Sequence, residues 1–172
     1  MLPPALTPWT HTAELRFKAY LKAMQEACLE IRPEYSLQVA AREVECQGVQ
    51  ETDVFKAMAE PPQAIIALHD LMALNVIRRC KERGLRVPED FAVAGFDDLP
   101  IARMLNPPLT TVRQAFQEMG RRAVQILAGH IRGEVPPPFK ECLPCELIIR
   151  ESCIRQSQMN SNQDQCDQIR QN

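Results

Sequence analysis

Gly95-Phe96-Asp97-Asp98 and Pro108-Leu109-Thr110-Thr111-Val112 are the stretches that decide the fold class of this 172-residue chain. The first stretch follows Phe91-Ala92-Val93-Ala94, an apolar run of strand length, and ends in two adjacent carboxylates. Continuous apolar runs of this length are typical of strands in a parallel sheet whose two faces are both covered. Ligands of such sheets bind outside the carboxyl ends of the strands. We therefore expect Asp97 to lie at a binding site, where its carboxylate can accept hydrogen bonds from hydroxyl groups.

Hydrophobic spacing predicts helices between the strands. Apolar residues recur at helical spacing in residues 12–31, before Pro33, and again in residues 114–132. A third helix is expected from Asp70, which can cap it, to Gly84, which can end it in a left-handed conformation. We also expect a short helix at residues 51–60 and strands at residues 37–44, 64–68, 91–95 and 147–150. The predicted class is therefore α/β.

Length and composition fit one domain with a polar tail. A chain of 172 residues with 45% apolar content can bury one core of ordinary size. We expect an extended, proline-rich lead-in at residues 1–11 and the domain at residues 12–152. Residues 153–172 are rich in glutamine and asparagine, so we expect a disordered tail there.

Charge and cysteine content argue against several classes of function. The net charge of −2 and the dispersed basic residues do not favour nucleic-acid binding by these residues. No stretch resembles a secretory signal or a membrane span. Seven scattered cysteines fit reduced thiols, and the single pair Cys142-Leu143-Pro144-Cys145 is weak evidence for metal or redox chemistry. We therefore expect a cytoplasmic protein with no membrane partner, no metal and no cofactor.

Five motifs in a fixed order carry a resemblance to a known family. They are His69-Asp70-Leu71-Met72-Ala73-Leu74, residues 83–90, residues 95–98, residues 109–112 and Leu147-Ile148-Ile149-Arg150-Glu151-Ser152. In this order, residues 13–152 resemble the C-terminal part of the effector-binding core of the lactose-repressor/galactose-repressor (LacI/GalR) family of bacterial transcription regulators. The resemblance implies a periplasmic-binding-protein-like parallel sheet flanked by helices, made of the second lobe and the return crossover helix. The family's helix-turn-helix and first lobe are not among these residues.

The resemblance also implies a set of ligand-binding residues. Arg16 matches an arginine that binds a ligand hydroxyl or carboxylate, and Asp97 matches an aspartate that accepts hydrogen bonds from sugar hydroxyls. Gln114 and Phe116 match positions at the return crossover, where a polar group and an aromatic ring border the ligand. His69 stands where many members have asparagine, and it can still donate to a hydroxyl.

Each of these residues also has a structural interpretation. Arg16 can pair with a surface acid, Asp97 can cap its turn, and His69 can be an ordinary loop residue. Phe116 lies on the apolar face of its helix and can therefore belong to the core. These alternatives stay open in the sequence.

The function implied by the resemblance is effector sensing in a sugar-responsive transcription regulator. A small polar effector would close two lobes and change the operator affinity of a homodimer, with DNA bound only through a headpiece absent from this chain. The dimer interface would include Leu74, Met104 and Leu105. Helix 114–132 would pack on the first lobe, so its face formed by Phe116, Met119, Ala123, Leu127 and Ile131 would be left open here.

Other classes of function are weighed against this one. Asp97 and Asp98 could serve acid-base catalysis, but adjacent residues point apart, and no nucleophile-base pair or phosphate loop accompanies them. We therefore predict that the chain is not an enzyme. Two interpretations remain open: a fragment of a secreted-type solute-binding protein, and a vestigial dimerisation module that does not bind ligand.

Overall fold

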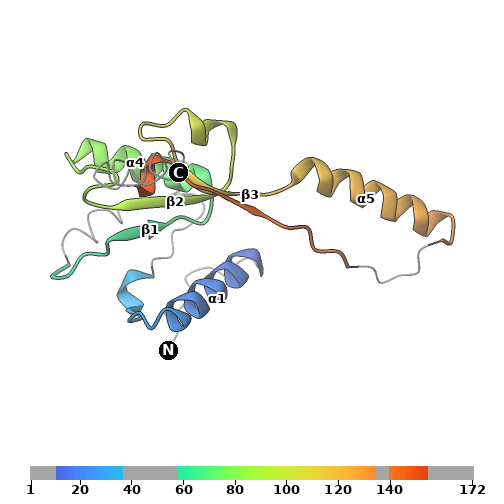
Figure 1. Ribbon diagram of the computed structural model, residues 1–172, viewed down its shortest axis with the longest axis horizontal. Coiled ribbons are helices and arrows are strands. Elements are labelled where there is room, and N and C mark those ends of the chain that lie inside the picture. The colour runs from blue at the N-terminus through green and yellow to red at the C-terminus, as the bar shows by residue number, and fades with distance from the viewer. Residues whose placement is uncertain (1–10, 37–57, 135–139, 155–172) are drawn as a thin grey trace, which may run out of the picture.

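The computed structural model describes residues 11–36, 58–134 and 140–154, and it contains one four-stranded sheet (Figure 1). The order of strands is β1 (Ala64–Ile66), β2 (Ala92–Asp97), β3 (Thr110–Arg113) and β4 (Glu146–Ile148). The first three strands are parallel, with Ala64 opposite Ala92 and Ala94 opposite Thr110, whereas β4 is antiparallel to β3. The predicted α/β class with a mostly parallel sheet is confirmed.

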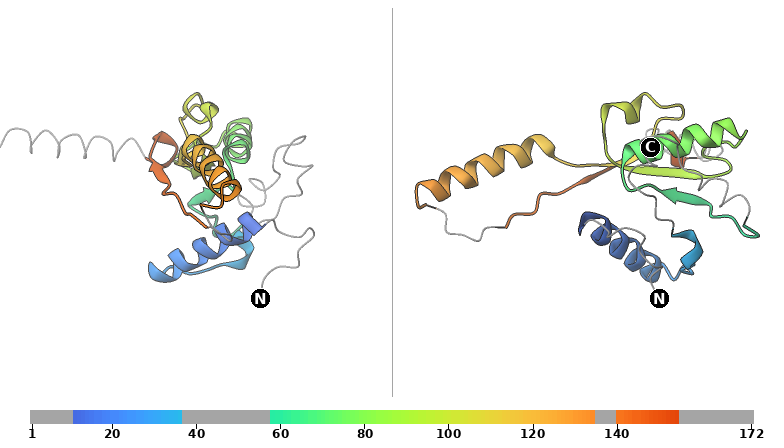
Figure 2. Two further views of the ribbon diagram at one scale, coloured as in Figure 1. Left: turned by 90° about the vertical axis from the view of Figure 1, so that its right-hand side faces the viewer. Right: turned by 180° about the vertical axis from the view of Figure 1, so that it is seen from behind.

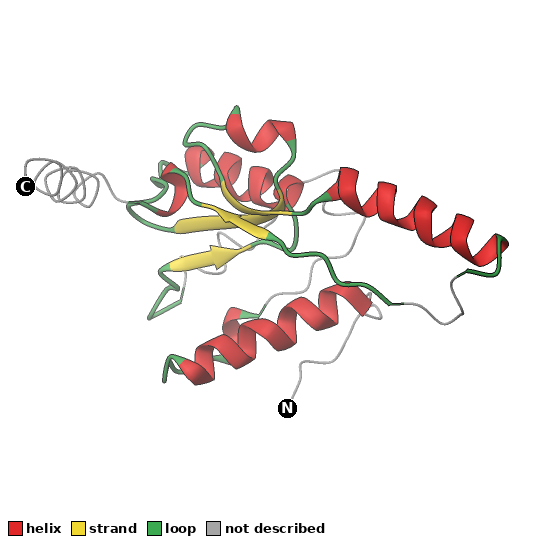
Figure 3. Ribbon diagram, turned by 45° about the vertical axis from the view of Figure 1, so that its right-hand side comes forward, coloured by secondary structure: helices red, strands yellow, loops and turns green. Residues whose placement is uncertain are grey.

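Helices flank this sheet. Helix α4 (Asp70–Glu82) and helix α1 (His11–Glu26) lie on opposite sides of the sheet, and α5 (Phe116–Ile131) extends away from it (Figures 1 and 3). Three short 3-10 helices complete the described elements: η1 (Pro33–Tyr35), η2 (Pro100–Arg103) and η3 (Glu151–Cys153). No helix in the described ranges is long and apolar enough to cross a membrane.

The element boundaries differ from the sequence expectations in several places. Helix α1 ends at Glu26 rather than at residue 31, because Cys28 takes a left-handed backbone angle of φ 53° that no α-helix continues through. Strand β1 is shorter than residues 64–68, and β2 continues to Asp97. The expected strand at 37–44, most of the helix at 51–60, and nearly all of the lead-in and tail lie outside the described residues.

The core lies between α4 and β2. Ala73, Val76, Ile77 and Cys80 of α4 are buried against Val93 of β2, together with Phe91, Ala102 and Leu109. Burial, assisted by the negative charge of Asp90, raises the pKa of the Cys80 thiol to about 11. This cysteine is therefore a core residue with little thiolate at neutral pH.

Asp70 is fully buried at the beginning of α4 and ties three segments together. Its Oδ1 accepts a hydrogen bond from Thr111 Oγ1 at 2.6 Å, and its Oδ2 accepts one from the Leu99 backbone N–H at 2.7 Å. We expected Asp70 to cap α4, and that expectation is wrong. The cap is His69, whose Nδ1 accepts from the Met72 backbone N–H at 3.2 Å, which frees the Asp70 carboxylate for the loop after β2.

Helix α5 exposes its apolar side. Figure 2 shows the helix projecting beyond the rest of the described chain, and among its residues only Gly129 is buried. All five residues of the expected open face are exposed, namely Phe116, Met119, Ala123, Leu127 and Ile131. The expectation that this face finds no cover within the described chain is confirmed.

Candidate functional site

Arg16, Asp97 and Gln114 meet at the carboxyl ends of the parallel strands. Arg16 lies in the second turn of α1, Asp97 is the last residue of β2, and Gln114 directly follows β3. Gln114 Nε2 donates to Asp97 Oδ1 at 2.6 Å, and Arg16 Nη2 lies 3.9 Å from the same oxygen. Arg16 Nη1 donates to the Leu68 carbonyl, which follows β1. The structure thus brings together three of the five predicted ligand-binding residues.

Phe96 is the part of this cluster that the sequence interpretation missed. The Arg16 guanidinium lies over the Phe96 ring, with Cζ 3.7 Å from the ring centroid. Side chains along a strand alternate between the two faces, so Phe96 and Asp97 would ordinarily point apart. The backbone at Asp97 leaves strand geometry with φ 110°, and both side chains reach Arg16. A cation over an aromatic face is restrained in position, so Phe96 orients the guanidinium.

The turn that ends β2 has an unusual backbone. Asp97 has φ 110° and Asp98 has φ 50°, a region that costs energy for residues other than glycine but is visited more readily by aspartate and asparagine. Two hydrogen bonds hold this turn in place. Leu99 N–H donates to Asp70 Oδ2, and Asp98 N–H donates to Thr111 Oγ1 at 3.3 Å. The conformation is therefore imposed by the buried groups beneath it.

Asp98 points away from the cluster and into a set of arginines. Its side chain is 1% exposed and binds Arg150 Nη2 at 2.6 Å and Arg113 Nε at 2.7 Å, with Arg103 Nη2 at 3.7 Å. Burial alone would raise the pKa of the Asp98 carboxyl, but the hydrogen bonds from Arg150 and Arg113 outweigh it and hold the pKa below its ordinary value. Asp98 is fully occupied within the protein, which leaves Asp97 as the carboxylate available to a ligand.

His69 and Phe116 are close to the cluster in sequence, and no hydrogen bond or ring contact in the described part of the chain joins their side chains to Arg16, Asp97 or Gln114. His69 follows Leu68, the acceptor for Arg16, and because its Nδ1 accepts a hydrogen bond, the neutral ring carries its proton on Nε2. Phe116 begins α5 two residues after Gln114 and is 51% exposed. The alternative that Phe116 belongs to the core is therefore wrong.

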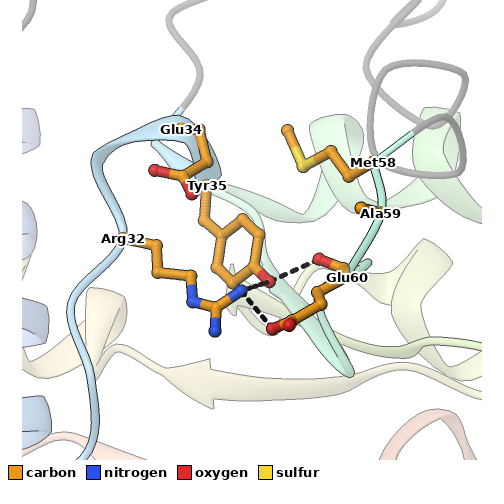
Figure 4. A pocket seen from close by; sticks show the side chains of 6 residues that line it. All are labelled: Arg32, Glu34, Tyr35, Met58, Ala59 and Glu60. Atoms are coloured by element: carbon orange, nitrogen blue, oxygen red, sulfur yellow. Dashed lines mark hydrogen bonds and ion pairs between the residues drawn. The ribbon is translucent and has the colours of Figure 1, made fainter.

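A cavity of about 310 Å³ lies elsewhere, between η1 and the chain before β1 (Figure 4). It is lined by Arg32, Glu34, Tyr35, Met58, Ala59 and Glu60. Three of its residues are paired with one another, since Arg32 Nη1 binds the Glu60 carboxylate at 2.5 Å and the Tyr35 hydroxyl donates to the Glu60 carbonyl at 2.5 Å. None of the predicted ligand-binding residues lines this cavity, so the cluster at Asp97 remains the candidate site.

The three residues expected at a dimer interface differ in exposure. Met104, directly after η2, is 78% exposed, whereas Leu74 on α4 is half-buried. Leu105 is also half-buried and packs against the core. Met104 thus contributes most of the exposed apolar surface among the three.

Comparison with known proteins agrees with this arrangement. The sequence model of the periplasmic binding protein-like domain matches residues 6–153. The chain belongs to this family. Within it, the chain corresponds to the effector-binding domain of LacI/GalR transcription regulators, as the matched proteins below indicate.

Three matched proteins are transcriptional regulators that contain a similar domain. The HTH-type transcriptional repressor PurR of Haemophilus influenzae (strain PittEE) is 38% identical over 144 residues, which cover 82% of this chain and 42% of the repressor. The solved complex of the transcriptional regulator CelR with cellobiose is 31% identical, with a TM-score of 0.72 and coverage of 81% and 42%. The lac repressor dimer bound to operator and an anti-inducer is 26% identical, with a TM-score of 0.69 and coverage of 84% and 49%. The chain therefore spans less than half the length of these regulators, which are transcriptional regulators and not enzymes.

Proposed function

We propose that this chain senses a small sugar-like effector for a bacterial transcription regulator, and that effector binding changes operator affinity in the full regulator. The observation that carries this proposal is the convergence of Arg16, Asp97 and Gln114 from three separate segments onto one edge of the sheet. The CelR complex with cellobiose supports the binding of a sugar-like effector, and the operator-bound lac repressor supports the link to operator affinity.

The polar atoms left available at the cluster suit hydroxyl groups. Asp97 Oδ1 is taken by Gln114, whereas Oδ2 has no partner among the described residues. Arg16 Nη1 is taken by Leu68, whereas Nη2 is 3.9 Å from Asp97, too far for a good hydrogen bond. An acceptor and a donor therefore lie side by side. A sugar hydroxyl both donates and accepts, so adjacent hydroxyls satisfy the two groups together.

Two further predicted residues extend this site. His69 Nε2 can donate to a ligand oxygen while Nδ1 continues to cap α4. The exposed ring of Phe116 offers an apolar surface for a sugar ring face.

We also infer how the domain fits the longer regulator. The open apolar face of α5 is the surface that packs against the first lobe, whose residues lie outside this chain. Leu74, Met104 and Leu105 form the contact with a second copy of the chain, in keeping with the dimeric lac repressor. The domain boundaries at residues 11 and 152 stay predictions.

The proposal is tested by titrating the isotope-labelled chain with cellobiose, galactose, ribose and adenosine. The signals to follow are the side-chain amide of Gln114 and the Nε–H of Arg16. We expect at least one sugar to shift both signals, and Asp97→Asn to weaken binding about 10- to 100-fold, the loss of one hydrogen bond to a charged group.

The matched control is Glu26→Gln, the same carboxylate-to-amide change at the far end of α1. This variant should bind as the unchanged chain does. If adenosine alone shifts the Gln114 and Arg16 signals, the effector is a nucleoside and not a sugar. No shift with any of the four compounds at millimolar concentration would overturn effector binding by this chain.

A further inference from the structure

The segment that returns from α5 to β4 carries two cysteines in an unusual setting. Cys142 and Cys145 are both exposed free thiols, separated by Leu143-Pro144. Residues 140–145 run without an assigned turn or bend directly into β4, and Figure 1 shows this part of the chain as an extended trace. The two thiols are therefore held apart along an extended backbone.

Each cysteine is next to a glutamate that ties the return segment to another element. Glu141, before Cys142, binds Arg122 of α5, with Nη2 to Oε2 at 2.8 Å and Nε to both carboxylate oxygens at 3.0 Å. Glu146, after Cys145, binds Arg113 Nη1 of β3 at 2.9 Å and lies opposite Arg113 in the sheet. The length of chain between the cysteines thus sets the distance between two anchoring ion pairs.

A bond between the two sulfurs would change that length. Three residues of extended chain separate two Cα atoms by about 10 Å. A disulfide requires about 4.4 to 6.8 Å between the same atoms. Closing the pair would shorten the segment by roughly 3 to 6 Å. The ion pairs, at 2.8 Å for Glu141 and 2.9 Å for Glu146, can each lengthen by only about 1 Å before the N···O distance passes about 4 Å.

We propose that Cys142 and Cys145 form a reversible disulfide with a small-molecule disulfide as oxidant, and that its formation releases the anchors at Glu141 and Glu146. One cysteine thiolate attacks the oxidised small molecule and expels one thiolate. The other cysteine attacks the resulting mixed disulfide and expels the second. Two protein thiols become one disulfide, and the two electrons leave in two small-molecule thiols.

The other described cysteines differ from this pair in burial or in position along the chain. Cys80 is fully buried with a raised thiol pKa. Cys153 is half-buried, and its Sγ donates to the Val93 carbonyl at 3.2 Å. Cys28 is exposed and lies in the turn after α1, in a different part of the described chain. Of the five cysteines that the structure describes, only Cys142 and Cys145 combine exposure with a nearby second thiol in sequence.

The experiment equilibrates the chain with glutathione at several ratios of oxidised to reduced form, then blocks free thiols and maps peptides by mass. We expect the peptide that contains both cysteines to lose the mass of two hydrogen atoms and to resist alkylation until it is reduced. Cys142→Ser and Cys145→Ser are the matched controls, because both positions are exposed and serine is close to cysteine in size. In these variants the remaining cysteine should carry glutathione instead.

Hydrogen exchange then tests the mechanical consequence. Amides of Arg113 and of β4 should exchange faster in the oxidised chain than in the reduced chain, while oxidised Cys142→Ser should match the reduced chain. Separate glutathione adducts on both cysteines would overturn the disulfide. A disulfide that leaves exchange at Arg113 and β4 unchanged would overturn the release of the anchors. Neither readout uses an effector, so failure here is distinct from failure of the proposed sensing function.

Discussion

Asp98→Asn should destabilise the domain more than any other isosteric change at the site. The carboxylate is 1% exposed and accepts hydrogen bonds from Arg150 and Arg113 at 2.6 and 2.7 Å. Asparagine keeps one acceptor oxygen but turns an NH₂ group toward the other guanidinium. It also removes the negative charge that the surrounding arginines neutralise.

The size of the effect follows from these contacts. Removing one partner of a buried ion pair costs about 3 to 5 kcal/mol. Arg113 and Arg103 are 41% and 65% exposed, so they can turn toward water, which places the cost at the lower end, about 3 kcal/mol. With a urea m-value of about 2 kcal/mol/M, the unfolding midpoint should fall by about 1.5 M. Urea unfolding followed by circular dichroism at pH 7 measures this shift.

The pH dependence provides a second readout. The folded pKa of Asp98 is lowered, so its contribution to stability is fully present above the unfolded value of about 3.9 and is lost as pH falls through the folded pKa. The difference in unfolding midpoint between the unchanged chain and Asp98→Asn should therefore shrink below about pH 4.

The matched control is Asp97→Asn, an identical change at the neighbouring residue, whose Arg16 partner is 3.9 Å away. We expect it to cost less than about 1 kcal/mol. Equal midpoints for Asp98→Asn and Asp97→Asn, or a difference that persists unchanged at pH 3, would refute the assignment of Asp98 as a buried ionic anchor.

Three further experiments test other parts of the structure. Gly95→Ala would place a Cβ 2.4 Å from Asp70 Oδ1, so urea unfolding should show a loss of about 2 kcal/mol, and a loss under about 0.5 kcal/mol would show that Asp70 yields easily. Leu74→Lys should shift the chain from dimer toward monomer in sedimentation, and a monomeric unchanged chain would contradict the interface. Amides of α5 should exchange faster than those of β2, because the helix has little tertiary cover; equally slow exchange in a monomer would show that its face is covered.

The fold could be predicted where a local pattern decides it. The apolar run before Gly95 gave β2, and the periodic apolar residues after Asp70 gave α4, because burial on one or both faces leaves a direct mark in the sequence. The end of α1 could not be predicted, because the left-handed residue there is Cys28, which carries none of the preference of glycine. Sequence assigns the cap of α4 to Asp70 rather than His69, since aspartate is among the residues preferred at caps, and only the folded chain shows that Asp70 is needed elsewhere.

The candidate site was also predictable from the sequence only in part. The resemblance to the repressor family predicts Arg16, Asp97 and Gln114 as ligand-binding residues, and the structure brings these three side chains together. The prediction that Asp97 and Asp98 point apart is confirmed by their separate partners. Phe96 and the arginines around Asp98 were missed, because a stacking contact across 80 residues of sequence and ion pairs between three elements leave no local pattern.

The geometry of the candidate site depends on a residue that no effector would contact. Gly95 has no side chain, which leaves room for Asp70 Oδ1 within 2.4 Å of where a Cβ would stand. Asp70 in turn fixes the Leu99 N–H and the Thr111 hydroxyl, and these two groups hold the turn in which both aspartates have positive φ. That turn directs Asp97 toward Gln114 and buries Asp98. Aspartate suits both positions for two reasons. It takes a positive φ more readily than most residues, and each of the two carboxylates lies on a different side of the same turn.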